Sequence, residues 1–167
     1  MQFFTDMFKK ISASMFALIL ICFFLPFITI SCQGSPVIKM SGLQMATGVE
    51  MADPSASLNS AFGGVPSTPK TQKIPGTPAV GITFCLAGVG LATSLLLKNR
   101  QRYLAQAIAG GLGVLLLLWV KSSTDDAVLK QGGIIQVNYD AGFWLAFLLF
   151  LGATGLNGYQ YLEDRKP

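Results

Sequence analysis

Between the apolar stretches of the sequence, the side chains best suited to bind a metal ion are those that contain sulfur. Thiolate and thioether sulfurs are soft ligands of the kind that bind Cu(I), and a group of them follows the first apolar stretch: Cys32, Met40, Met45 and Met51. Their spacing matches no established metal-binding pattern, and methionine also fills gaps in apolar packing. These residues are therefore candidates for an interaction made by a loop, and the sequence predicts neither a bound metal nor a cofactor.

Other residue types with chemical potential are scarce. None of the 167 residues is histidine, which excludes bis-histidine haem sites, typical catalytic zinc sites and histidine general bases within this chain. The adjacent carboxylates Asp125 and Asp126 are too few for a calcium site and are typical of a solvated acidic turn. No cluster of Lys and Arg with interleaved aromatic residues indicates nucleic-acid binding. We expect a protein that is not an enzyme and has no nucleic-acid partner.

The framework that positions these residues must be built from long apolar stretches of the sequence. Only 12% of the residues are charged, whereas soluble domains average about 25%. Four stretches contain no Asp, Glu, Lys or Arg, and each approaches the length of about 20 residues at which a helix crosses a hydrocarbon core. The sequence predicts an all-α integral membrane protein, one domain over residues 1–167. Its four transmembrane helices would form an antiparallel bundle and would cover residues 11–30, 79–97, 103–120 and 141–161.

Basic residues orient this bundle. Lys98, Arg100 and Arg102 lie in the short turn between the second and third spans, without an acidic residue. Because Lys and Arg retain short loops in the cytoplasm, we expect both termini to be cytoplasmic, most simply at a bacterial inner membrane. No span holds an Asp, Glu, Lys or Arg, which disfavours a proton- or cation-coupled transporter that works alone.

The long connection over residues 31–78 is expected to be a partly irregular extracytoplasmic loop. Residues 31–52 mix apolar and small residues and could form a short helix or turn on the membrane surface. From residue 53 the loop is rich in Pro, Ser, Thr and Gly, which favours an extended linker. Before the fourth span, residues 134–140 alternate as a strand does. They could pair with part of the long loop as a small outer cap.

The end of the first apolar stretch leaves two alternatives open. Cys32 follows a long apolar run, as the lipidated cysteine of a lipoprotein does, but Thr29 fits a lipobox poorly. The run also exceeds the roughly 7–15 apolar residues of a signal sequence. The favoured interpretation places Cys32 at the outer interface, at the end of the first helix. Pro26 would then bend that helix near Cys22.

Small residues within the spans are candidates for close helix packing, either inside the bundle or against another protein. They are Gly88, Ala92, Ala105, Ala109, Gly113, Gly152 and Gly155. Two polar residues of the spans, Gln106 and Asn157, could hydrogen-bond across helices.

The predicted function rests on two features of the sequence: helix faces suited to close packing, and the lack of evident catalytic residues. We expect an accessory or scaffold subunit of a larger membrane protein complex, which acts through helix packing and its outer loop. Its partners would be membrane lipids and other membrane protein subunits. The alternative is a small transporter, channel component or lipid-handling protein, because a four-helix bundle can host a path in its core. A membrane enzyme comes third.

Overall fold

Helices dominate the fold. The structure is a computed structural model that describes residues 2–32, 35–52, 71–96, 101–129 and 135–163. Three helices are long and apolar enough to cross a membrane. With a further helix at the start of the chain they form a ring, in which the first and third helices each pack between the second and the fourth. The bounds in chain order are α1 (Gln2–Cys22), α4 (Pro78–Leu96), α5 (Gln101–Leu129) and α6 (Ala141–Glu163).

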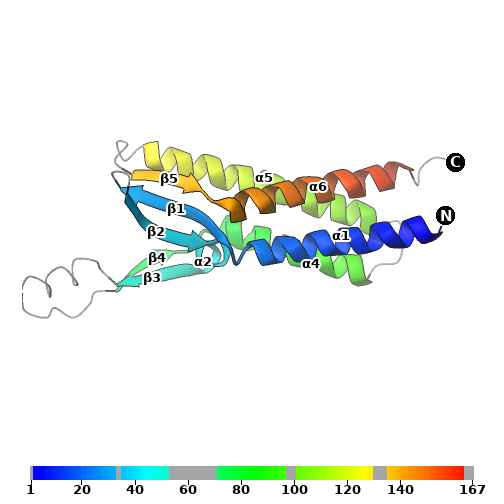
Figure 1. The fold of residues 1–167 in the computed structure, drawn as a ribbon, viewed down its shortest axis with the longest axis horizontal. Helices are drawn as coiled ribbons and strands as arrows, with labels where there is room; N and C mark the ends of the chain where they lie inside the picture. The colour runs from blue at the N-terminus through cyan, green and yellow to red at the C-terminus, as the bar shows by residue number, and fades with distance from the viewer. Residues whose placement is uncertain (1, 33–34, 53–70, 97–100, 130–134, 164–167) are drawn as a thin grey trace, which may run out of the picture.

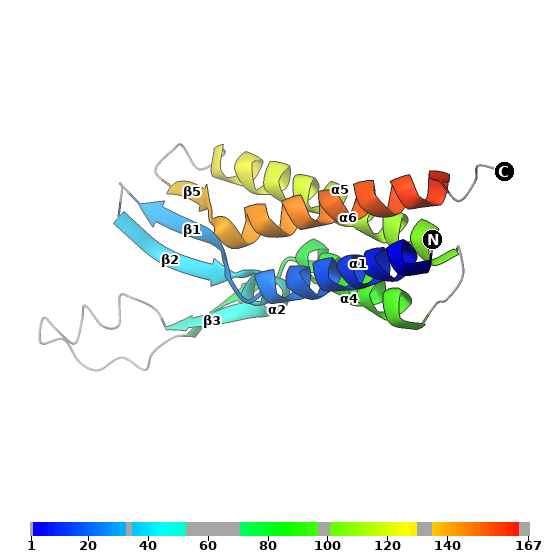
Figure 2. The ribbon, with the colours of Figure 1, turned by 45° about the vertical axis from the view of Figure 1, so that its right-hand side comes forward.

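Two small antiparallel sheets stand at one end of this bundle. One has the strand order β2-β1-β5, and the other pairs β3 with β4. Figures 1 and 2 show that the sheets continue the long axis beyond the helices, whereas α1 begins and α6 ends at the opposite end. We call these two ends the sheet end and the terminal end, and the strands with α2 the head. The head consists of β1 (Pro26–Cys32), β2 (Ser35–Ser41), α2 (Gly42–Thr47), β3 (Gly48–Ala52), β4 (Thr71–Pro75) and β5 (Ile135–Tyr139).

The first helix ends earlier than the sequence predicts. A helix over residues 11–30 was expected, with a bend at Pro26, but α1 stops at Cys22 and Pro26 opens β1. Proline lacks the N–H that a helix needs and disfavours helical backbone in the residue before it, so the helix stops instead of bending. Aromatic and β-branched residues then follow and favour a strand. Cys32 consequently lies at the far end of β1 and not at the end of a helix.

The remaining connections match their predictions in part. The strand predicted near residues 134–140 exists as β5, but it pairs with β1, most of which was expected in the first span. The short helix predicted within residues 31–52 is α2, where Ser41 and Gln44 cap each other. Residues 71–75, expected in an extended linker, form β4, and residues 53–70 lie outside the described part of the chain.

The third helix is longer than predicted. α5 continues to Leu129, so that Asp125 and Asp126 lie in its last turns and not in a separate acidic turn. Figure 1 shows α5 running past the ends of its neighbours and alongside β5. This extension brings a helix that begins at the terminal end into contact with the head.

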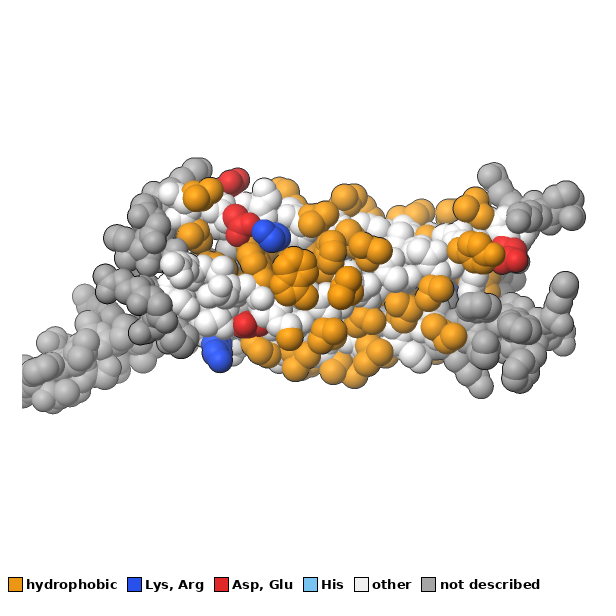
Figure 3. Space-filling model, turned by 45° about the horizontal axis from the view of Figure 1, so that its top comes forward, with side chains coloured by type: hydrophobic (Ala, Val, Ile, Leu, Met, Phe, Trp, Pro, Cys, Tyr) orange, Lys and Arg blue, Asp and Glu red, His pale blue; other side chains and the backbone are white. Residues whose placement is uncertain are grey.

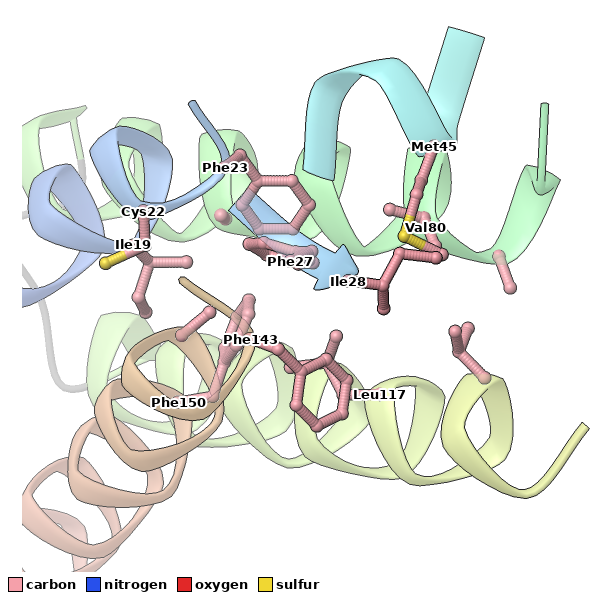
Figure 4. Packing of buried hydrophobic residues seen from close by; sticks show 14 of the residues in the cluster. Ile19, Cys22, Phe23, Phe27, Ile28, Met45, Val80, Leu117, Phe143 and Phe150 are labelled. Atoms are coloured by element: carbon pink, nitrogen blue, oxygen red, sulfur yellow. The ribbon is translucent and has the colours of Figure 1, made fainter. Parts of the chain in front are cut away.

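Aromatic side chains join the bundle to the three-stranded sheet. The Phe27 ring of β1 lies 5.0 Å from that of Phe23 and 6.1 Å from that of Phe143 on α6. The ring of Phe84 on α4 is 5.3 Å from Phe23. Figure 4 shows Phe23, Phe27 and Phe143 converging in the core. The head is therefore packed against the bundle by buried rings.

Candidate functional site

Three polar side chains are buried inside the helix ring towards the terminal end. Ser12 on α1 is 4% exposed, and Gln106 on α5 and Asn157 on α6 are each 1% exposed. Each lies on the face of its helix that also carries the buried apolar residues, because helical neighbours three and four positions apart share a face. We call these residues the polar cluster.

The polar cluster connects all four helices. The Ser12 hydroxyl lies 3.2 Å from Gln106 Oε1 and 3.1 Å from Asn157 Oδ1. The Asn157 amide donates to the carbonyl of Ala153 on its own helix at 2.7 Å. The Gln106 amide reaches the carbonyl of Gly90 on α4 at 3.4 Å, which is a long hydrogen bond. The cluster thus ties α1, α5 and α6 directly and α4 more weakly.

The hydroxyl proton of Ser12 lies between two possible hydrogen-bond acceptors. A serine hydroxyl donates one hydrogen bond, so it serves either Gln106 Oε1 or Asn157 Oδ1 at a given moment. The short bond to Ala153 fixes the orientation of the Asn157 amide. A rotated Gln106 amide would donate to Ser12, lose its long bond to Gly90 and turn its own oxygen towards the Gly90 carbonyl, whereas a rotated Asn157 amide would lose the short bond to Ala153. Gln106 is therefore the adjustable member of the cluster.

A buried arginine adjoins the polar cluster, which sequence reasoning missed. Arg102 was assigned to a basic turn, but it lies in the first turn of α5 and is 3% exposed. Its guanidinium donates to the Tyr103 hydroxyl and lies 4.4 Å from the centre of that ring. The signal available in the sequence was its spacing of four from Gln106, which places both on one helix face.

A second group of polar contacts lies at the sheet end. The Lys121 ammonium lies 2.7 Å from Asp125 Oδ2 on the next turn of α5. The Tyr139 hydroxyl of β5 is 2.7 Å from Asp125 Oδ1 and 3.1 Å from the Lys121 carbonyl. We call Lys121, Asp125 and Tyr139 the outer latch, because they hold the edge strand β5 against the extension of α5.

The outer latch shifts the acidity of its members. Hydrogen bonds from Lys121 and then from Tyr139 stabilise the carboxylate and lower the pKa of Asp125. Burial, followed by the hydrogen bond to Asp125, raises the pKa of Tyr139. At neutral pH the Tyr139 hydroxyl therefore stays protonated and donates a hydrogen bond to the ionised Asp125 carboxylate.

A further contact fastens the central strand to α6. The Thr29 hydroxyl of β1 donates to Asp140 Oδ2 at 2.6 Å, and the Asp140 N–H donates to the Phe27 carbonyl at 2.8 Å. Asp140 directly precedes α6, where its negative charge meets the positive end of the helix dipole. The head is thus attached to the bundle by polar contacts as well as by rings.

Two of the small residues singled out for packing lie at close contacts between helices. A Cβ atom at Gly113 would come 2.5 Å from the Phe150 ring. One at Gly152 would come 2.8 Å from Met15 Cε. These two glycines allow α5 and α6 to pack closely against the facing side chains. A third residue of the set, Ala109, is buried.

The other four small residues are not shown at close contacts between helices in the described part of the chain. Added Cβ atoms at Gly88 and Gly155 would meet nothing within 4 Å. Ala92 is exposed and Ala105 half-buried.

Two other glycines make the close contacts that the sequence did not single out. A Cβ atom at Gly90 would overlap the Phe16 ring, and one at Gly110 would lie 2.5 Å from the Thr154 hydroxyl. Spacing alone does not tell which side of a helix is inward, and this is why Gly88 was chosen over Gly90.

The four sulfur-containing residues proposed for a loop interaction also fall into two groups. Met40 and Met45 are buried and belong to the core beneath the head. Cys32 lies in β1 and Met51 in β3, with side chains outside the described part. Among the described residues, no three His, Cys, Asp or Glu side chains gather closely enough to hold a metal ion.

The chemistry of the polar cluster is that of neutral hydrogen bonding. Its hydroxyl and amide groups do not titrate near neutral pH, so the cluster itself can bind and position but cannot act as an acid or a base. No protein-family model, curated protein or solved structure matches this chain.

Proposed function

We propose that this chain is an integral membrane protein that crosses the bilayer four times and serves as an accessory or scaffold subunit of a larger membrane complex. The observation that supports it is an inverted distribution of side chains. Polar Ser12, Gln106 and Asn157 point into the bundle, while large apolar side chains point outward. Such a surface is costly in water and favourable in lipid. The outward set includes Leu18, Ile21, Ile82, Val89, Ile108, Leu112, Leu115, Leu148 and Leu151.

The position of the charged residues agrees with a bilayer around the bundle. On α5 no charged residue lies between Arg102 and Lys121, a rise of about 28 Å, close to the hydrocarbon thickness of about 30 Å. Figure 3 shows apolar side chains along the middle of the bundle and charged ones towards its two ends. The extension of α5 beyond Lys121, with the outer latch, then lies outside the hydrocarbon core.

The sidedness follows from the basic turn between α4 and α5. Lys98 and Arg100, with Arg102 in the first turn of α5, favour retention of the terminal end in the cytoplasm. The head would then be extracytoplasmic, as at the inner membrane of a bacterium.

An accessory role fits a bundle that is occupied by its own side chains. Phe16, Ile19, Leu117 and Phe150 are fully buried in it, and the polar cluster finds hydrogen-bond partners within the chain. The surfaces left for other proteins are the head and the outward helix faces. Neither the cluster nor the outer latch supplies the acid–base pair that an enzyme would need, so we assign no catalytic role.

Gentle solubilisation tests this proposal. The chain, tagged at its C-terminus and extracted from native membranes in a mild detergent, should migrate on a native gel with an assembly much larger than 17.8 kDa. A harsh detergent should release it, which controls for aggregation. Stable migration as a lone monomer in the mild detergent would contradict the accessory role.

The alternative function is a small transporter, channel component or lipid-handling protein. The polar cluster favours it, because buried polar residues in a membrane bundle can mark a path. Vesicles that contain only this chain should then show solute or lipid movement, and S12A should reduce it more than S14A, a change on the exposed side of the same helix.

A further inference from the structure

We propose that the turn between α1 and β1, Phe23 to Pro26, is embedded in the outer leaflet of the bilayer and completes the first crossing. This inference rests on the proposed membrane location. The apolar part of α1 covers Ile11–Cys22, a rise of about 18 Å, which is too short to cross a core of about 30 Å alone. The non-helical turn would supply the remaining lipid contact.

The side chains of the turn divide between protein and surroundings. Phe23 is fully buried and packs on Phe27 and Phe84. Phe24 is 66% exposed and Leu25 is 40% exposed. A phenylalanine and a leucine side by side on the surface of a turn are unfavourable in water and suited to acyl chains.

The backbone of the turn meets the main requirement for lipid contact. An N–H without a hydrogen bond costs several kcal/mol in hydrocarbon, so non-helical backbone occurs there only where the protein supplies its partners. Phe23, Phe24 and Leu25 donate to the carbonyls of Ile19, Ile21 and Cys22, at 3.3, 3.0 and 3.0 Å. Pro26 has no N–H. Every N–H donor of the turn is thus bonded or absent, and the Phe23 carbonyl accepts from the Leu43 N–H at 3.0 Å.

The turn also completes a belt of exposed apolar side chains that surrounds the bundle near the sheet end. The first turns of α4 and α6 carry exposed Ile82, Trp144 and Leu145, and α5 carries exposed Trp119 at the sheet end. Figures 1 and 2 show α1 ending where α4 and α6 begin. Leu25 lies against the start of α6, because a Cβ atom at Gly142 would be 3.0 Å from Leu25 Cβ. Since α1 has already ended, only Phe24 and Leu25 continue the belt on its side.

The belt indicates lipid as the occupant of this surface. A partner helix would cover one side of the bundle, whereas the exposed apolar residues follow all four segments of the ring. Tryptophan at this level is typical of the boundary between acyl chains and headgroups. The outer boundary of the hydrocarbon core therefore passes near Phe24, Trp119 and Trp144.

Tryptophan fluorescence tests the depth of the turn directly. The chain has two tryptophans, Trp119 and Trp144. Single-tryptophan variants that keep one of them serve as references, and F24W is placed in the W119F/W144F background. K39W in the same background is the matched control, because Lys39 is exposed on β2 of the head. Each variant is reconstituted in vesicles that contain phospholipids brominated near the carboxyl end of the acyl chain.

The expected result is that bromolipid quenches F24W by as large a fraction as it quenches the two references, while aqueous iodide quenches only K39W. If F24W instead responds to iodide, or to neither quencher, while the references respond to bromolipid, the inference is overturned and the membrane location stands. If the references also escape bromolipid, the proposed function falls with it. L25W gives a second reading if F24W does not fold.

Discussion

The Ser12 hydroxyl is a single donor that holds α1 to the rest of the bundle through the polar cluster. We predict that S12A lowers the free energy of unfolding by about 0.6 kcal/mol, and by no more than about 1.7 kcal/mol, the range found for hydrogen bonds between membrane helices. Reversible unfolding in mixed micelles at increasing SDS fraction measures it. S14A, on the exposed side of the same helix, should leave stability unchanged. Equal effects of the two changes would contradict the structural role of the cluster.

Asp125 makes the outer latch sensitive to acid. Its pKa in the folded protein lies below its ordinary value of 3.8, so the unfolded chain takes up the proton first as the pH falls. The stabilisation is complete well above pH 3.8 and is lost as the pH falls through that value to the folded pKa. We predict that D125N is less stable than the parent protein at pH 7 and that this difference shrinks steadily as the pH is lowered below 3.8, as measured by thermal unfolding in detergent.

The neighbouring carboxylate provides the control for this experiment. Asp126 is exposed on the same turn of α5. D126N should therefore follow the parent protein across the whole pH range. A gap between D125N and the parent that stays the same size from pH 7 to well below pH 3.8 would show that the asparagine disturbs packing and that the latch does not act through charge.

The contact between α1 and α4 depends on the absence of a side chain at Gly90. A Cβ atom there would overlap the Phe16 ring, and overpacking of this kind costs about 1–3 kcal/mol. We predict that G90A lowers the midpoint of thermal unfolding, whereas G88A, which would meet nothing within 4 Å, leaves it unchanged or raises it. If G88A proves as damaging as G90A, an unseen contact covers that face of α4.

The sequence predicted the elements whose signals are local. The helices expected at residues 79–97 and 141–161 appear as Pro78–Leu96 and Ala141–Glu163. The first span was misjudged because the strand after Cys22 is stabilised by pairing with β5, more than 100 residues further along the chain. Local composition does not report such a partner, so the apolar residues of β1 were read as more helix.

The candidate site was predictable to a similar degree. Gln106 and Asn157 stood out as the polar residues of apolar spans. Their common partner Ser12 did not, because a serine near the start of an apolar stretch is unremarkable until the facing helices are known. Arg102 was missed because a basic residue beside a turn is normally exposed.

Sidedness is a property of the whole molecule, because in the proposed topology of four crossings the side of one connection fixes the side of all the others. We predict that Q44C on α2 reacts with a membrane-impermeant maleimide added to intact cells and that Q101C at the start of α5 does not. Both side chains are exposed in the structure. The measurement is made with Cys22, Cys32 and Cys85 replaced by alanine. Reaction of Q101C only after the membrane is opened confirms its accessibility, and the reverse pattern would invert the topology.

Because α5 is one uninterrupted helix, it couples the terminal end of the molecule to the sheet end. One helix carries Gln106 at one extremity and Lys121 and Asp125 at the other, with no break between them. Each residue of an α-helix turns its successor by about 100°. A rotation of α5 about its own axis would therefore move Gln106 and the Lys121–Asp125 pair together. The hydrogen bonds inside the bundle and the contact with β5 in the head would have to change at the same time.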